Sequence, residues 1–235
     1  MRIIFTKRIS KIMISKKLGS HFSYDFIDVI KINPLIVEPF DLKNKSLIFT
    51  SVNAVQSFFA NGFKPDEDFT SKKYNKIYTV GITTKRELRK YGYGTFKVTK
   101  HAKELSEFII ENSSKEKFLH FCGNLALDVL NKTLPLQNIS YKKIPVYETQ
   151  LLYPKFSGAY DAVCFFSPSG VRSFAKFNTL ENVKIFSIGE TTEKEIRKFT
   201  KSPIITSKES NLDDLLNLIA EHSSEAKPSG SKKIL

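Results

Sequence analysis

The residues best suited to chemistry lie where short apolar runs end and amphipathic segments begin. Two of these turns read VGITT and IGETT, and three more read LIFTS, HFCGN and FFSPSG. The candidate ligand-binding residues in the five turns are Thr50, Ser51, Gly81, Thr83, Thr84, Cys122, Gly123, Asn124, Ser167, Pro168, Ser169, Gly170, Gly189, Thr191 and Thr192. Each turn is expected at the carboxyl end of a parallel strand, where the free N–H groups of a helix N-terminus attract oxyanions.

A purely structural role competes with binding at each turn. Serine or threonine before a helix commonly caps it, so any single turn of this kind is more often a cap than a ligand site. Five such turns at the same ends of the strands in two related domains favour a ligand with several anionic groups, held between the domains.

Other kinds of site have little support. The sequence has no GxxxxGK[ST] run and no GxGxxG turn after a strand, which argues against a nucleotide site. No metal site is expected, because the histidines show no ligand spacing and are interpreted as surface or hydrogen-bonded core residues. These are His21, His101, His120 and His222. Cys122 and Cys164 lie in apolar runs typical of small buried side chains, and FFSPSG lacks the GxSxG pattern of a nucleophilic serine.

Tyr147, in IPVYET, is different, because it lies on a segment expected to connect two domains. Its phenol could face a cleft there. From the spacing alone, a ring that packs against a hinge is equally good as an interpretation.

The segments that must position these residues alternate between runs rich in β-branched and aromatic residues and amphipathic stretches. This alternation predicts an α/β fold. The chain has 235 residues, 41% of them hydrophobic, and a formal net charge of +13, which suggests an anionic partner or simply solvated lysine-rich faces. Its basic start has no apolar core of signal-peptide length, and no stretch approaches a membrane span. With two cysteines outside any CxxC pair, the sequence predicts a cytoplasmic protein.

An internal repeat predicts how the domains are assembled. LIFTSVNAVQSF resembles VCFFSPSGVRSF, the two GxTT turns follow at matching positions, and KELSEFII resembles DDLLNLIA. A fourth unit, FCGNLALDVLNKTL, has its counterpart near the N-terminus in FTKRISKIMISKKL. We therefore predict two similar parallel-sheet α/β domains of flavodoxin-like type, joined by a two-stranded β-ladder, with the first domain discontinuous. The predicted parts are residues 1–33 with 152–222 for domain 1, 38–144 for the inserted domain 2, 34–37 and 145–151 for the linker strands, and 223–235 for a disordered basic tail.

Taken in order, the motifs LIFTS-x-NAV, VG-x-x-T, FCGN, VYET, FFSPSGV and IG-x-TT resemble uroporphyrinogen-III synthase over nearly the whole chain. The resemblance implies a lyase that cyclises hydroxymethylbilane, a linear tetrapyrrole with an acetate and a propionate on each ring, to uroporphyrinogen III in haem biosynthesis. It implies an active site between the domains and no cofactor. Tyr147 matches the tyrosine proposed to assist departure of the hydroxyl, while Thr84, Ser167, Thr191 and Thr192 match polar positions of the cleft. At the end of the first strand this chain has Thr6-Lys7, where the family commonly has Thr-Arg, so a carboxylate contact there would be monodentate.

Two alternatives from other classes remain open at this stage. A two-lobed α/β protein could bind an anionic metabolite without catalysis, although relatives of that architecture are usually exported. Nucleic-acid binding is disfavoured, because no element carries a basic run interleaved with aromatic residues. We expect a small-molecule substrate, no nucleic acid or membrane partner, and a monomer.

Overall fold

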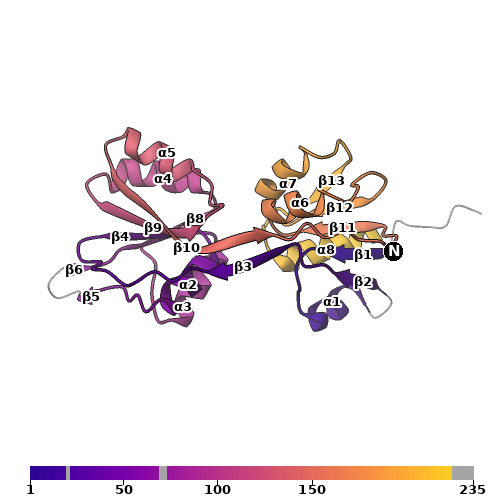
Figure 1. Ribbon diagram of the computed structural model, residues 1–235, viewed down its shortest axis with the longest axis horizontal. Helices are drawn as coiled ribbons and strands as arrows, with labels where there is room; N and C mark the ends of the chain where they lie inside the picture. Colours follow the sequence, from indigo (N-terminus) through magenta and orange to yellow (C-terminus); the bar gives the residue numbers. More distant parts are fainter. Residues whose placement is uncertain (20–21, 69–72, 224–235) are drawn as a thin grey trace, which may run out of the picture. The chain divides into compact units, whose positions relative to one another are not determined.

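The computed structural model describes residues 1–19, 22–68 and 73–223, and the chain divides into two compact units. Unit 1 comprises Met1–Lys31 and the chain from Gln150 onward, and unit 2 comprises Ile32–Thr149 (Figure 1). Apart from Ser223, which ends the last helix, the predicted tail lies outside the described residues.

Unit 1 is a five-stranded sheet in which every neighbouring pair is parallel. Its order is β13 (Ile204–Thr206), β12 (Lys184–Ser187), β11 (Ala162–Phe165), β1 (Arg2–Phe5) and β2 (Ser23–Phe26). Its helices are α1 (Lys11–Leu18), α6 (Pro168–Phe174), α7 (Glu190–Ile196) and α8 (Leu212–Ser223). Helix α1 packs with α8, and α6 packs with α7. Because alternate strand residues point to opposite faces, Ile3 and Phe5 join the core with α1 and α8, whereas Ile4 joins the core with α6.

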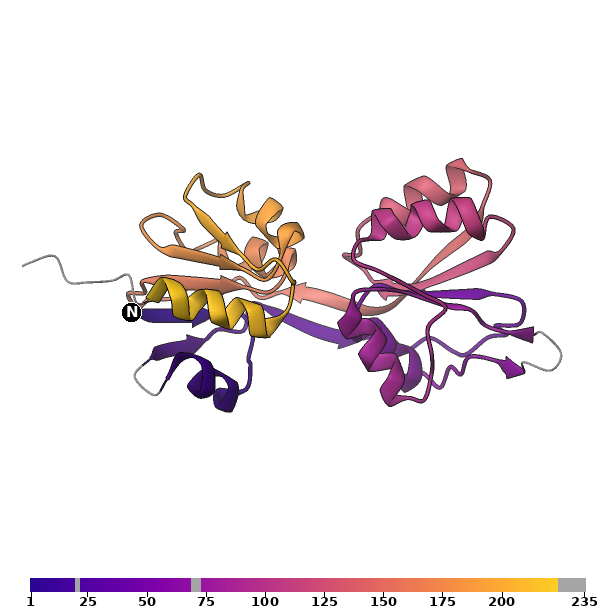
Figure 2. The same cartoon turned by 180° about the vertical axis from the view of Figure 1, so that it is seen from behind.

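Unit 2 repeats this plan. Its sheet runs β3 (Ile30–Pro34), β10 (Ser140–Leu151), β9 (Lys117–Gly123), β4 (Ser46–Phe49), β7 (Ile77–Val80) and β8 (Lys97–Thr99), and the pairs from β10 to β8 are parallel. Helices α2 (Val52–Ala60) and α3 (Ile82–Lys90) cover one face, and α4 (Ala102–Asn112) and α5 (Val129–Leu136) cover the other (Figure 2). A short antiparallel pair, β5 (Glu67–Asp68) and β6 (Lys73–Tyr74), completes the described elements.

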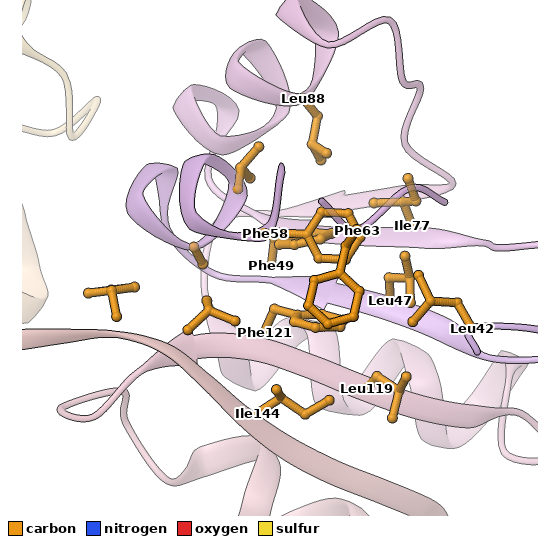
Figure 3. Close-up of a cluster of buried hydrophobic side chains, with 14 residues drawn as sticks. Leu42, Leu47, Phe49, Phe58, Phe63, Ile77, Leu88, Leu119, Phe121 and Ile144 are labelled. Atoms are coloured by element: carbon orange, nitrogen blue, oxygen red, sulfur yellow. The ribbon is translucent and has the colours of Figure 1, made fainter. Parts of the chain in front are cut away.

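Phenylalanine fills the core of unit 2 on the α2 side of the sheet. Phe58 and Phe63 stack at 5.0 Å between ring centroids, and Phe58 meets Phe121 edge-on at 4.7 Å (Figure 3). Phe49 lies beside the same cluster, and all four side chains are buried. Such ring pairs add about 0.5 to 1.5 kcal/mol each to the gain from area burial. The cluster supports β4 and β9 from one face, just before both strands end.

The two sheets have the same spatial arrangement, as the sequence repeat predicts. Strands β8, β7, β4, β9 and β10 of unit 2 occupy the places of β13, β12, β11, β1 and β2 in unit 1. In chain order, unit 1 has the 2-1-3-4-5 order of flavodoxin-like sheets. The expected α/β fold with parallel sheets is therefore correct.

Each sheet has one place where adjacent strands send their connections to opposite faces. In unit 2, β4 leads to α2 on one face and β9 leads to α5 on the other; in unit 1, β11 leads to α6 and β1 leads to α1. Open α/β sheets bind ligands in the crevice at such a switch point, beyond the carboxyl ends of the strands.

The two crossings between the units form a pair of neighbouring strands. Leu35 N–H donates to the carbonyl of Val146, and Leu152 N–H donates to that of Val29, so β3 and β10 run in opposite directions. Residues 145–151, predicted as a separate linker, are the second half of the single long strand β10.

One predicted helix begins later than its sequence suggests. The sequence pattern predicts a helix from Asn124, but strand β9 continues to Gly123 and α5 begins only at Val129. The reason is local hydrogen bonding: Asn124 N–H donates to the carbonyl of Tyr147, and its side-chain oxygen accepts from Thr149 N–H. Asn124 is therefore held by β10 and cannot open a helix.

Candidate active site

The switch point of unit 2 brings together hydroxyl groups from two adjacent strand ends. Thr50 and Ser51 follow β4, and Ser51 caps α2 by accepting a 3.1 Å bond from Ala54 N–H. Gly123 ends β9, the strand beside β4, and Asn124 follows it. Five of the residues predicted from the sequence, Tyr147 included, therefore lie in one small region.

Tyr147 reaches across this switch point from β10. Its hydroxyl lies 3.0 Å from the Ser51 hydroxyl, although β9 stands between β10 and β4 in the sheet. The path is open because residue 123 has no side chain: a Cβ there would lie 2.5 Å from two atoms of the Tyr147 ring. The pairing of β10 with β9 shifts its register between Pro145 and Tyr147, and this irregularity directs the Tyr147 side chain toward Ser51. Sequence reasoning proposed Gly123 for binding and missed this packing role.

Tyr147 is a protonated phenol at ordinary pH. The side chain is buried, and burial raises its pKa above the usual value of 10.0, while the bond with Ser51 lowers it in part. A neutral phenol can donate a proton or a hydrogen bond. The arrangement therefore suits Tyr147 to act as a proton donor more than as a base.

Behind Thr50 lies a histidine that the sequence did not mark as part of the site. His120 Nε2 is 3.0 Å from the Thr50 hydroxyl, and Nδ1 is 2.7 Å from the hydroxyl of Tyr141. His120 is buried on β9, and burial together with the charge of Lys143 lowers its pKa to about 3. The interpretation of His120 as a hydrogen-bonded core histidine is confirmed, and no local motif pointed to its link with Thr50.

In both duplicated threonine turns a glycine directly precedes the helix, and the threonines do not cap it. Gly81 and Gly189 occupy the N-cap positions and neither helix has a side-chain cap bond, so the interpretation of these turns as side-chain caps is wrong for both. Gly81 has a φ of 85°, a backbone conformation that β-branched residues such as threonine adopt only with strain, so this position suits glycine. In each turn the first threonine (Thr83, Thr191) is exposed and the second (Thr84, Thr192) is buried. The turns present helix N-termini at the ends of β7 and β12.

In unit 1, Thr6 lies at the corresponding switch point with the FFSPSG turn. Its hydroxyl donates a 2.8 Å bond to the carbonyl of Cys164, and Lys7 beside it is exposed. Ser167 caps α6 by accepting from Gly170 N–H at 3.1 Å and bonds the Ser169 hydroxyl, with Pro168 in the first helical turn. Because the Thr6 hydroxyl is already engaged, Lys7 and the Ser167 turn are the accessible polar groups here.

Both cysteines are buried, as predicted. Burial raises the pKa of the Cys122 thiol to about 11 and raises that of Cys164 as well. A buried neutral thiol is a poor nucleophile, so a ligand contact at Cys122 would come from its backbone.

Within the described residues, no three His, Cys, Asp or Glu side chains are grouped as a metal site would need. None of the helices described is both long enough and apolar enough to span a membrane.

Comparison with known proteins gives one family and one fold. The sequence profile described as "Uroporphyrinogen-III synthase HemD" matches residues 24–217. Among curated proteins, no sequence matches the chain.

Solved structures agree with this family. The uroporphyrinogen-III synthetase of Helicobacter pylori 26695 is similar at 23% identity, covering 94% of this chain and 100% of that one, with a TM-score of 0.66. A mutant uroporphyrinogen III synthase of the extremely thermophilic bacterium Thermus thermophilus is similar at 14% identity, covering 95% of this chain and 98% of that one, with a TM-score of 0.62. At these identities the structures support the two-domain α/β fold, and nothing in the comparisons favours the non-catalytic alternative.

Proposed function

This chain belongs to the uroporphyrinogen-III synthase family, and on that premise we propose that Tyr147 and the polar ends of the two sheets bind and cyclise hydroxymethylbilane. The family is one of cyclising lyases in haem biosynthesis, acting on a small tetrapyrrole. The observation that carries the assignment is the profile match over residues 24–217.

The substrate suits the polar groups at the strand ends. Hydroxymethylbilane carries an acetate and a propionate on each of four pyrroles, and its carboxylates need donors at several separate points. Helix N-termini with adjacent hydroxyls follow β4, β7, β11 and β12. A hydrogen bond to a charged carboxylate contributes about 1.5 to 3 kcal/mol. We assign carboxylate binding to Thr50, Gly81–Thr84, Lys7, Ser167–Gly170 and Gly189–Thr192.

Tyr147 is assigned the role of the acid that assists departure of the hydroxyl. Ser51 already accepts from Ala54 N–H, and its own proton can be donated to the Tyr147 oxygen. In that arrangement the phenol proton is free to reach the leaving group. Burial favours the protonated phenol. General acids of this kind contribute about 10²- to 10⁴-fold in rate.

The proposed reaction loses one water and needs no external oxidant or reductant. The hydroxyl leaves with a proton as water, pushed by a pyrrole nitrogen, and an azafulvene cation remains. The substituted carbon of the terminal pyrrole attacks it and forms a spiro intermediate. A carbon–carbon bond of that intermediate breaks, the ring closes in the inverted orientation, and a ring proton is lost. The protein's main task is to hold the chain so that the substituted carbon attacks, which is catalysis by orientation.

The finer context is also part of the proposal: a monomer working in the cytoplasm. Two free, buried cysteines fit a reducing compartment.

The test is product analysis. Incubation of the pure protein with freshly generated hydroxymethylbilane should give the type III isomer, while the same mixture without protein gives the symmetrical type I isomer. Only type I product from protein shown to be folded by circular dichroism would overturn the assignment.

A further inference from the structure

In the hydrogen bond between His120 and Thr50, one of the two side chains is the donor, and the tautomer of His120 decides which. At about pH 7 the imidazole is neutral, because its pKa is lowered to about 3, so one ring nitrogen donates and the other accepts. Either Tyr141 donates to Nδ1 and Nε2–H donates to Thr50, or Thr50 donates to Nε2 and Nδ1–H donates to Tyr141. The two arrangements leave the Thr50 proton in different places.

The first arrangement is favoured by the chemistry of the two end groups. Burial raises the pKa of Tyr141 above the usual value of 10.0, but a phenol is still a more acidic hydrogen-bond donor than the alcohol of threonine, and the alcohol oxygen is the better acceptor. With Tyr141 donating and Thr50 accepting, the proton of Thr50 points away from His120. Thr50 is only half-buried, so this proton can reach a ligand at the switch point.

The fold itself does not require this chain of bonds. In the repeat alignment, Ile4 and Phe166 of unit 1 occupy the positions of His120 and Thr50, and both lie in an apolar core or against one. Unit 1 therefore builds the same pair of strand ends without any buried polar group at these positions. A buried polar side chain costs free energy unless it is hydrogen-bonded, which points to a use for the group in unit 2.

We propose that His120 is a positioning residue that holds the Thr50 hydroxyl as an outward donor to a carboxylate of the substrate. This inference rests on the proposed function for the identity of the anion. The relay, in which Tyr141 donates to His120 and His120 donates to Thr50, is a property of the free protein. Thr50 would bind the carboxylate equally well in the ground state and in the transition state. Loss of its hydroxyl therefore raises KM and leaves kcat nearly unchanged.

The first experiment needs no substrate. Nitrogen-15 NMR of histidine-labelled full-length protein should show His120 with the proton on Nε2, its signal identified by its absence from His120→Gln. A proton on Nδ1 would overturn the relay. Tyr141→Phe removes the phenol donor, and the tautomer should then shift toward Nδ1–H.

The second experiment measures kinetics with hydroxymethylbilane. His120→Leu and Thr50→Val should each raise KM about tenfold or more, as expected for losing a bond to a charged group, and the double variant should lose no more than either single one. His120→Gln keeps a donor and should recover part of the loss. Unchanged KM in His120→Leu would overturn the proposal.

Failure of the two proposals can be told apart. Wild-type protein that makes no type III isomer contradicts the proposed function and leaves the tautomer measurement intact. Wild-type activity with the opposite tautomer, or with KM unaffected by these variants, contradicts the relay alone. Should His120→Leu fail to fold, Thr50→Val and Tyr141→Phe give the same test, with an expected rise in KM that must appear in both.

Discussion

Gly123→Ala is expected to displace the ring of Tyr147 and to lower both stability and turnover. The added methyl carbon would lie 2.5 Å from two ring atoms and 2.9 Å from the hydroxyl, whereas ordinary contact begins at 3.4 Å. An overlap of about 1 Å cannot be absorbed within the contact distance of carbon atoms, so the ring must rotate or the strands must separate. The hydrogen bond between Tyr147 and Ser51 is then lost.

The size of the effect follows from two contributions. Overpacking typically costs about 1 to 3 kcal/mol, and a lost neutral hydrogen bond adds about 1 kcal/mol. Gly123→Ala should therefore lower the free energy of unfolding by about 2 to 4 kcal/mol, measured by chemical denaturation. If Tyr147 is the acid, kcat should also fall by about tenfold to a hundredfold.

A double-mutant cycle isolates the ring contact. Tyr147→Leu lacks the ring atoms that a Cβ at position 123 would meet, so Gly123→Ala should cost little in that background, with a coupling of about 1 to 3 kcal/mol. Gly94→Ala is the matched control, because nothing lies within 4 Å of its Cβ position, and its effect should stay within about 0.5 kcal/mol. Equal costs of Gly123→Ala with and without the ring would refute the reasoning.

Three further predictions concern single groups of the site. Tyr147→Phe should lower kcat by about tenfold to a hundredfold with type III product retained, and normal turnover would make Tyr147 a packing residue. Thr83→Val and Thr191→Val should raise KM by about tenfold with little change in stability, since both side chains are exposed and neither caps its helix; an unaffected KM would contradict substrate binding there. Unfolded His120 takes up a proton below about pH 6.5 and folded His120 only near pH 3, so falling pH destabilises the fold by up to about 1.4 kcal/mol per pH unit in that window. Denaturation across this range should show a shallower loss for His120→Gln than for wild type or for a variant of the exposed His101, and parallel curves would contradict it.

The repeat in the sequence was sufficient to predict the paired sheets. Glycine, serine and threonine mark the strand ends in both halves, and they are local signals with a fixed meaning for the backbone. LIFTS and FFSPSG became the ends of β4 and β11 with serine caps, as expected from Ser51 and Ser167. The matching positions of these residues in the two halves predicted the paired sheets better than any single motif did.

Side-chain contacts between strands could not be predicted from local sequence patterns. The reach of Tyr147 over Gly123 to Ser51 depends on a pairing irregularity between β9 and β10, whose partners are far apart in the chain. The same is true of His120, since its place between Thr50 and Tyr141 follows from which strands become neighbours. The late start of α5 has this origin too, because β10 holds Asn124 by hydrogen bonds.

The discontinuous course of unit 1 governs the order in which the protein can fold as it is made. Strand β1 leaves the ribosome before unit 2, yet its neighbour β11 emerges only after unit 2, and Ile3 pairs with Ala162 only then. Unit 2 is continuous from Ile32 to Thr149 and can fold while β1 still waits with one edge unpaired. Slower translation through unit 2 therefore helps that unit to fold but prolongs the exposure of the apolar residues Ile3, Ile4 and Phe5 to chaperones and to other nascent chains.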